Sequence, residues 1–212
     1  MTLWLHVHGG YPSYQESGAQ WRNADYDAFK LVQALKGKPI KGYVTLKGRR
    51  FTTANPAPAF TIFGEWGASV LAKIGGTGYL APVPSASATT LEGDPKGASL
   101  AAAVANLAPS YVALDTFCWK EAMPKSSQGG SRHQQTLFNN LKVRSGLEPQ
   151  NFVLIDDVVS TGSHLLACAR ALRYFGHTVE HAIVAAQTVW NHPPTNMFDI
   201  APRDLEADPC DF

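Results

Sequence analysis

Residues 151–164, with the sequence NFVLIDDVVSTGSH, limit the folds open to this chain more than any other segment. The apolar run at 153–155 is typical of a strand that is covered on both faces. Two adjacent ionised carboxylates would be costly inside a core, so we place Asp156 and Asp157 at the open end of that strand. Hydroxyl residues, a glycine and a helical pattern follow. The segment therefore predicts a strand, an acidic pair, a short loop and a helix.

The predicted loop and helix start are suited to a phosphate group. Free backbone N–H groups and the positive end of the helix dipole point to the same place, and a glycine lets the backbone approach a ligand closely. The carboxylates are suited to sugar hydroxyls or a hydrated cation, so a sugar phosphate would use both features. An ordinary strand–helix turn with an exposed acidic pair is the alternative. The candidate phosphate-binding residues are Ser160, Thr161, Gly162, Ser163 and His164.

Strands and helices alternate along the chain, which predicts an α/β fold with a mostly parallel twisted sheet flanked by helices. Ligands in such sheets bind at the carboxyl ends of the strands, where we expect the acidic pair. The predicted strands are 2–7, 42–46, 59–63, 77–83, 111–117 and 177–187, and the predicted helices are 25–36, 66–74, 98–107 and one that starts at 163. The strands 42–46 and 59–63 are expected to form a hairpin joined by the basic segment Lys47-Gly48-Arg49-Arg50.

Composition narrows the class of protein. The 212 residues fit one domain, and a net charge of +1 indicates no global attraction to nucleic acid or membrane. Three scattered cysteines without zinc spacing indicate a reducing compartment. There is no apolar run of ~18 residues and no signal-peptide pattern at the start. We therefore expect a cytoplasmic protein without a membrane partner.

Two further segments are suited to anions. Residues 79–87 are an apolar strand that ends in a proline-flanked loop of small residues, Ser85, Ala86 and Ser87, whose backbone N–H groups would be open to an anion. Residues 120–144 are rich in cations and contain a Ser-Ser-Gln-Gly-Gly stretch that cannot pack a core. A loop of this kind is often a functional lid, although a solvated surface connection is the alternative.

Residues 151–164 resemble the phosphoribosyl-diphosphate (PRPP) signature of type I phosphoribosyltransferases. The resemblance implies that Asp156 and Asp157 contact the ribose hydroxyls and Mg²⁺, the latter through water or those hydroxyls. It further implies that the loop at 160–164 wraps the 5′-phosphate and that the loop at 85–87 receives the pyrophosphate. A flexible loop would close over PRPP, and our candidates for the cation that reaches the pyrophosphate are Lys125 and Arg132.

The triplet Pro82-Val83-Pro84 and the stretch Arg132-His133-Gln134-Gln135 resemble the ComF-like branch of this family. That branch usually carries a cysteine-rich zinc element, which this sequence lacks. His164 stands where the signature usually has a small hydroxyl residue, and Ser160 stands where purine-salvage members have an aspartate. The resemblance implies a single domain over 1–212 with its core at 77–187, while 1–76 and 188–212 supply a small hood or peripheral elements.

The resemblance implies transfer of a 5-phosphoribosyl group from PRPP to a nitrogenous acceptor, with release of pyrophosphate. A non-catalytic regulatory or effector subunit that binds PRPP or another ribose-5-phosphate-containing nucleotide is the alternative. Such a subunit would act with a protein or nucleic-acid partner. The sequence selects neither the acceptor nor the oligomeric state, so a homo-oligomer stays open.

Overall fold

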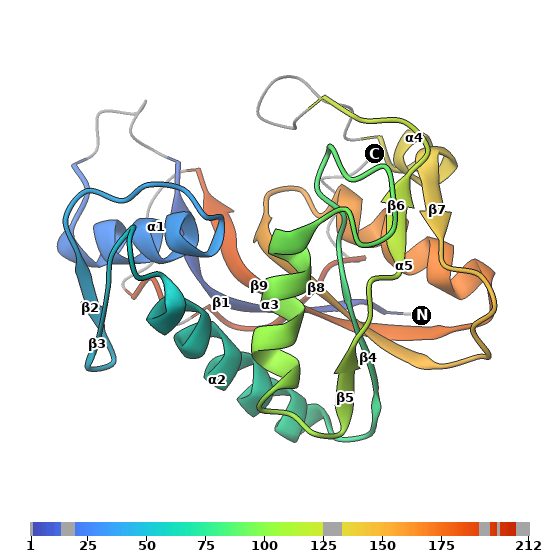
Figure 1. Ribbon diagram of the computed structural model, residues 1–212, viewed down its shortest axis with the longest axis horizontal. Helices are drawn as coiled ribbons and strands as arrows, with labels where there is room; N and C mark the ends of the chain where they lie inside the picture. Colours follow the sequence, from blue (N-terminus) through green and yellow to red (C-terminus); the bar gives the residue numbers. More distant parts are fainter. Residues whose placement is uncertain (1, 14–19, 125–132, 191–195, 199, 207–212) are drawn as a thin grey trace.

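The computed structural model describes residues 2–13, 20–124, 133–190, 196–198 and 200–206. Its centre is a six-stranded sheet in the order β10-β1-β9-β8-β4-β5 (Figure 1). Five strands are parallel, and β10 (Arg203–Asp204) runs antiparallel to β1 at one edge. The other bounds are β1 (Trp4–Pro12), β4 (Gly78–Pro82), β5 (Tyr111–Ala113), β8 (Asn151–Val159) and β9 (Thr178–Val189). The predicted α/β class, with a mostly parallel sheet between helices, is confirmed.

Three helices cover one face of the sheet. They are α1 (Asn23–Leu35), α2 (Ala57–Ile74) and α3 (Pro95–Ala105). Their apolar sides pack on Val153 and Ile155 of β8 and on Ile183 of β9, which form one buried cluster with them. A small hairpin, β2 (Val44–Leu46) and β3 (Arg49–Phe51), is anchored to the same cluster by Val44 and Phe51.

Two helices and a second small sheet cover the opposite face. The helices are α4 (Gln134–Asn140) and α5 (Ser163–Tyr174), and the sheet pairs β6 (Phe117–Trp119) with β7 (Leu141–Val143). Phe152 and Leu154 of β8 join this second buried cluster. Successive β8 residues therefore enter different cores, which explains why the apolar run at 153–155 is continuous.

The predicted strand at 59–63 is wrong, because these residues belong to α2. The helix predicted at 66–74 is confirmed as the second part of this longer helix. The aromatic and β-branched residues at 60–63 imitate a strand, but the buried residues of the segment follow helical spacing. Gly64 and Gly67 allow close packing: a Cβ on Gly64 would lie 2.3 Å from the Ala103 carbonyl oxygen of α3. The partner of β2 is instead β3, across the turn Lys47-Gly48.

Two other predictions need correction. The strand predicted at 111–117 is divided between β5 in the main sheet and β6 in the small one. The predicted lid at 120–144 is not one loop, because its second part forms α4 and β7 and buries Leu137 and Leu141.

The division of the chain into a core at 77–187 and a hood stays a prediction. Within the predicted hood, β1 is an inner strand of the main sheet. Within the described residues no helix is long and apolar enough to span a membrane.

Candidate functional site

The acidic pair lies at a step between two strands of different length. The last paired residues of β4 and β8 are Pro82 and Ile155, whereas β8 continues against β9 as far as Val159. Asp156 and Asp157 are therefore inside β8 and beyond the end of β4, not at the end of their own strand as the sequence predicted. Both residues are half-buried, and the Asp157 side chain is 34% exposed.

The two acids are linked by a short hydrogen bond. The Asp157 backbone N–H donates to Asp156 Oδ1 over 2.7 Å. Burial raises the pKa of Asp156 well above its usual value, and the negative charge of Asp157 raises it further. A nearby positive charge or hydroxyl donor would stabilise the ionised form of such a pair. It is therefore suited to bind either sugar hydroxyls or a cation.

A lysine that the sequence did not single out completes the acidic pair. Lys36, at the end of α1, has its Nζ 3.5 Å from Asp157 Oδ1 and 5.7 Å from the centre of the Tyr11 ring. Gln33 of the same helix donates to the Tyr11 hydroxyl over 3.0 Å. Lys36 also counteracts the rise in the pKa of Asp156. The end of α1 is thus tied both to β1 and to the acids on β8.

The predicted phosphate loop leads into α5, which begins at Ser163. Gly162 is the residue before the helix, with a φ of 90°, and no side chain caps the first turn. The Thr161 and Ser163 hydroxyls are hydrogen-bonded to each other over 3.0 Å. Within the described residues the backbone N–H groups of Thr161 and Gly162 have no protein acceptor. A phosphate would supply acceptors at this position.

Leu205 covers one side of this loop. A Cβ on Gly162 would lie 2.7 Å from Leu205 Cδ1, and Leu205 is fully buried. Leu205 donates its backbone N–H to the Leu3 carbonyl, next to the β1–β10 pair. The segment around β10 therefore packs against the phosphate loop through Leu205. Only glycine allows both this close contact and the left-handed backbone at position 162.

The second predicted anion loop follows β4 directly, so it leaves the sheet beside the acidic pair. The Val83 N–H donates to the Ile155 carbonyl over 2.9 Å. Asp94, before α3, accepts from the Ser85 N–H over 2.8 Å and from the first turn of its own helix. The Ser85 N–H is therefore already used. The N–H groups of Ala86 and Ser87 have no acceptor among the described residues.

Trp119 connects the two loops. Its Nε1–H donates to the Ser85 carbonyl over 2.9 Å, and its ring meets the His164 ring edge-on at a centroid distance of 5.8 Å. The side chain is fully buried. Trp119 also donates its backbone N–H to the Ala88 carbonyl. One rigid aromatic residue therefore sets the spacing of the segments that were predicted to hold the two ends of a ligand.

The predicted lid cations, Lys125 and Arg132, lie outside the described residues. Two histidines of β1, His6 and His8, are among the described residues. His6 Nε2 lies 3.2 Å from His181 Nδ1, and burial lowers the pKa of His6 to about 4. His8 is buried, has a pKa that burial lowers to about 4, and its Nδ1 has no hydrogen-bond partner within the described residues. Both imidazoles are packing elements of β1.

A hydrated Mg²⁺ is compatible with the acidic pair. Among the described residues no cluster of three or more His, Cys, Asp or Glu side chains could enclose a metal ion. Mg²⁺ keeps several of its waters and is often held by one or two carboxylates together with substrate phosphates. Asp156 and Asp157 are the residues that fit this mode of binding.

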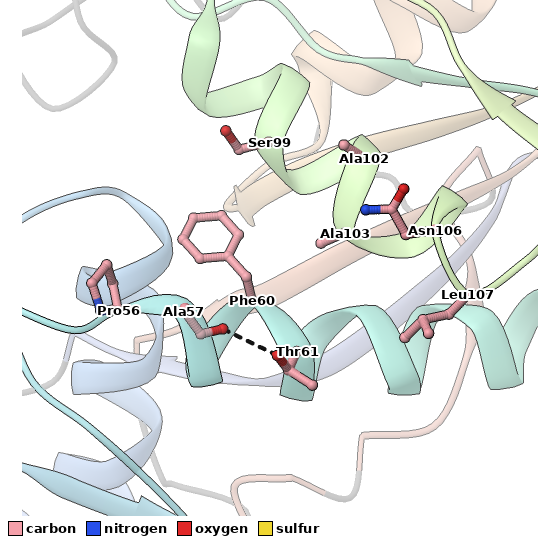
Figure 2. A pocket seen from close by; sticks show the side chains of 9 residues that line it. All are labelled: Pro56, Ala57, Phe60, Thr61, Ser99, Ala102, Ala103, Asn106 and Leu107. Carbon is pink, nitrogen blue, oxygen red and sulfur yellow. Dashed lines mark hydrogen bonds between the residues drawn. The ribbon is translucent and has the colours of Figure 1, made fainter.

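An open groove on the described part of the molecule lies away from these residues. Figure 2 shows this open groove of about 600 Å³ between α2 and α3. None of the predicted site residues lines it; its lining consists of Pro56, Ala57, Phe60, Thr61, Ser99, Ala102, Ala103, Asn106 and Leu107. The chemical groups of the candidate site therefore do not coincide with this groove.

No family model and no curated protein matches the chain. Solved structures with a similar fold include adenine phosphoribosyltransferase from Thermoanaerobacter pseudethanolicus, with 16% identity over 70% of this chain and 95% of that one, at a TM-score of 0.41. Orotate phosphoribosyltransferase from Aeropyrum pernix has 19% identity over 74% and 81% of the chains, at a TM-score of 0.39.

A third similar structure is adenine phosphoribosyltransferase from Trypanosoma brucei, solved with AMP, pyrophosphate and ribose-5-phosphate. It has 16% identity over 66% of this chain and 70% of that one, at a TM-score of 0.42. At these identities and TM-scores the similarity carries no argument about ligands or activity.

Proposed function

We propose that the protein binds PRPP with Mg²⁺ and transfers its 5-phosphoribosyl group to a nitrogenous acceptor, releasing pyrophosphate. The observation that carries the proposal is the convergence around Asp156 and Asp157. Trp119 donates to the loop at 85–88 and contacts the loop at 160–164. These loops follow β4 and β8, which pair with each other as far as Ile155, the residue before the acidic pair. PRPP has a group for each of these elements: a phosphate at one end, a diphosphate at the other end and a diol between them.

Each part of the site has one role in this proposal. Asp156 and Asp157 orient the ribose hydroxyls, and Lys36 balances part of their charge. The residues Ser160, Thr161, Gly162, Ser163 and His164 hold the 5′-phosphate. The N–H groups of Ala86 and Ser87 receive the diphosphate, with Ser85 fixed to Asp94 as their support. Lys125 or Arg132 supplies a cation to the departing diphosphate.

The chemistry follows from charge and position. The bond between the anomeric carbon and the diphosphate breaks, the electron pair leaves with the diphosphate, and the acceptor nitrogen forms the new bond. Positive charge grows on the ribose ring and negative charge on the leaving group, so fixed carboxylates and N–H donors stabilise both. Bound Mg²⁺ would add positive charge at the leaving group.

The test is titration calorimetry of PRPP with Mg²⁺. The variant Asp156→Asn/Asp157→Asn is expected to lose at least tenfold in affinity, since each lost charge-assisted hydrogen bond is worth about 1.5–3 kcal/mol. The control is Glu148→Gln/Glu180→Gln, which removes the same charge from exposed positions at the amino-terminal ends of β8 and β9. Unchanged PRPP affinity in the acidic-pair variant would refute the assignment.

A non-catalytic PRPP or nucleotide sensor is the second candidate. His164 favours it, because its imidazole is placed against Trp119 where the signature usually has a small hydroxyl residue. Pyrophosphate release with a panel of bases and amines separates the two: turnover supports the transferase, and binding without turnover supports the sensor. The ComF-like branch and a cytoplasmic location belong to the proposal in either form.

A further inference from the structure

Positive charge is concentrated in one stretch of the chain. Residues 28–64 hold seven of the 18 lysines and arginines and none of the 17 acidic residues. The rest of the chain therefore carries a net negative charge, although the net charge of the whole is +1. A charge asymmetry of this kind indicates a surface that meets an anionic partner. The cations are Lys30, Lys36, Lys38, Lys41, Lys47, Arg49 and Arg50.

We call the part of the molecule at residues 28–53 the basic lobe; it comprises the second half of α1 and the β2–β3 hairpin, on the left of Figure 1. Two of its cations are paired. Lys36 contacts Asp157, and Arg49 forms a two-pronged ion pair with Glu65 at 2.7 and 2.8 Å. The others have no acidic partner among the described residues: Lys30, Lys38, Lys41, Lys47 and Arg50.

The outer face of the hairpin combines two of these cations, Lys30 and Arg50, with an exposed aromatic ring. Tyr43 is 55% exposed, and the Arg50 guanidinium lies 3.9 Å from the centre of its ring. The Lys30 Nζ lies 3.5 Å from the Tyr43 carbonyl oxygen. The hairpin residues Val44 and Phe51 are buried, so the opposite side holds the hairpin to the core. The face that carries Tyr43 and Arg50 is therefore presented on a fixed support.

We propose that this face of the basic lobe binds single-stranded nucleic acid. Its free cations would contact successive phosphates, and Tyr43 with its stacked Arg50 would take one unpaired base. An acidic protein surface would use the cations alone and would gain little from an exposed aromatic ring. A duplex keeps its bases stacked inside the helix, so the ring favours a single strand. Tyr43, Arg50 and Lys41 are not among the residues of the candidate site, so this proposal does not depend on the proposed function.

The test is fluorescence anisotropy of a labelled oligothymidylate at several salt concentrations. The wild-type affinity is expected to fall linearly on a log–log plot against salt. The variant Lys41→Gln/Arg50→Gln is expected to reduce that slope by about 0.7 for each phosphate contact removed. Tyr43→Ala is expected to weaken binding about fivefold or more without changing the slope, because it removes stacking and no charge.

The matched control is Lys73→Gln/Lys142→Gln, which removes two exposed cations outside the basic lobe. An equal loss in this control would overturn the proposal, since binding would then follow net charge alone. Absence of salt-dependent binding would overturn it, as would equal competition by polyglutamate or by duplex DNA. PRPP titration of the lobe variants is expected to match wild type, so failure of this proposal and failure of the proposed function are separately visible.

Discussion

Gly162→Ala tests whether the phosphate loop is held as the structure describes. The glycine has a φ of 90°, and a left-handed conformation costs an L residue roughly 1–2 kcal/mol. The new methyl group would also lie 2.7 Å from Leu205 Cδ1 and 2.9 Å from Leu205 Cδ2, and Leu205 is fully buried. Overpacking of this kind costs about 1–3 kcal/mol. We expect a total loss of about 2–5 kcal/mol in the free energy of unfolding.

The two contributions can be separated within the same helix. Gly176, after the other end of α5, has a φ of 84°, and a Cβ added there would meet nothing within 4 Å, so Gly176→Ala reports the backbone cost alone. The difference between the two glycine variants gives the cost of the Leu205 contact. In a Leu205→Ala background that contact is absent, so Gly162→Ala should cost only about 1–2 kcal/mol there.

Urea unfolding, followed by tryptophan fluorescence, measures the free energy of unfolding of each protein. The set is the wild type, Gly162→Ala, Gly176→Ala, Leu205→Ala and the double variant Gly162→Ala/Leu205→Ala. The same loop variant is expected to weaken PRPP binding, whereas Gly176→Ala is expected to leave it unchanged. If Gly162→Ala costs no more than Gly176→Ala, or if Leu205→Ala does not reduce its cost, the loop is not packed against the β10 segment as described. In that case Leu205 would not hold the phosphate loop in a rigid position.

Three further predictions concern stability. Trp119→Phe should cost about 2 kcal/mol, because it removes the donor to the Ser85 carbonyl and leaves a gap in the core; urea unfolding measures it. Lys36→Met should cost about 0.5–1 kcal/mol, while Lys36→Arg and the exposed Lys38→Met should stay close to wild type. Asp156→Asn should stabilise the protein at pH 7. Folding raises the pKa of Asp156 well above 3.8, so the wild type loses free energy of unfolding as the pH rises from 3.8 and the carboxyl group ionises, whereas the asparagine variant does not. The gain should vanish below pH 3.8, and an equal gain at every pH would contradict the assigned cause.

A fourth prediction concerns acid sensitivity. Burial lowers the pKa of His8 from 6.5 to about 4, so its contribution to stability is complete above pH 6.5 and is lost as the pH falls towards 4. His8→Leu is therefore expected to flatten the loss of unfolding free energy between these two pH values. A pH profile identical to that of the wild type would show that His8 titrates normally.

The sequence predicted the parts of the site that are local in the chain. An apolar run, two acids, a glycine loop and a helix follow one another between 151 and 174, so their order alone places the acids next to the loop. The position of the acids within β8 was not predictable, because it depends on how far β9 and β4 extend. Strand length is set by neighbours that are remote in sequence.

Two other features, the contact between Lys36 and Asp157 and the full length of α2, could not be predicted from the sequence. Lys36 and Asp157 are brought together by the packing of α1, and a lone lysine after a helix carries no local sign of such a contact. In α2, aromatic and β-branched residues at 60–63 favour a strand locally, while the packing of Gly64 against α3 selects a helix. Tertiary packing outweighed local preference there.

The most direct test of the site is hydrogen–deuterium exchange with and without PRPP and Mg²⁺. If the two loops and the acidic pair form one site, amides at 83–88 and at 158–166 should exchange more slowly with the ligand, while those at 44–51 in the basic lobe should not change. Protection of neither loop, or protection confined to the groove between α2 and α3, would contradict the proposed site.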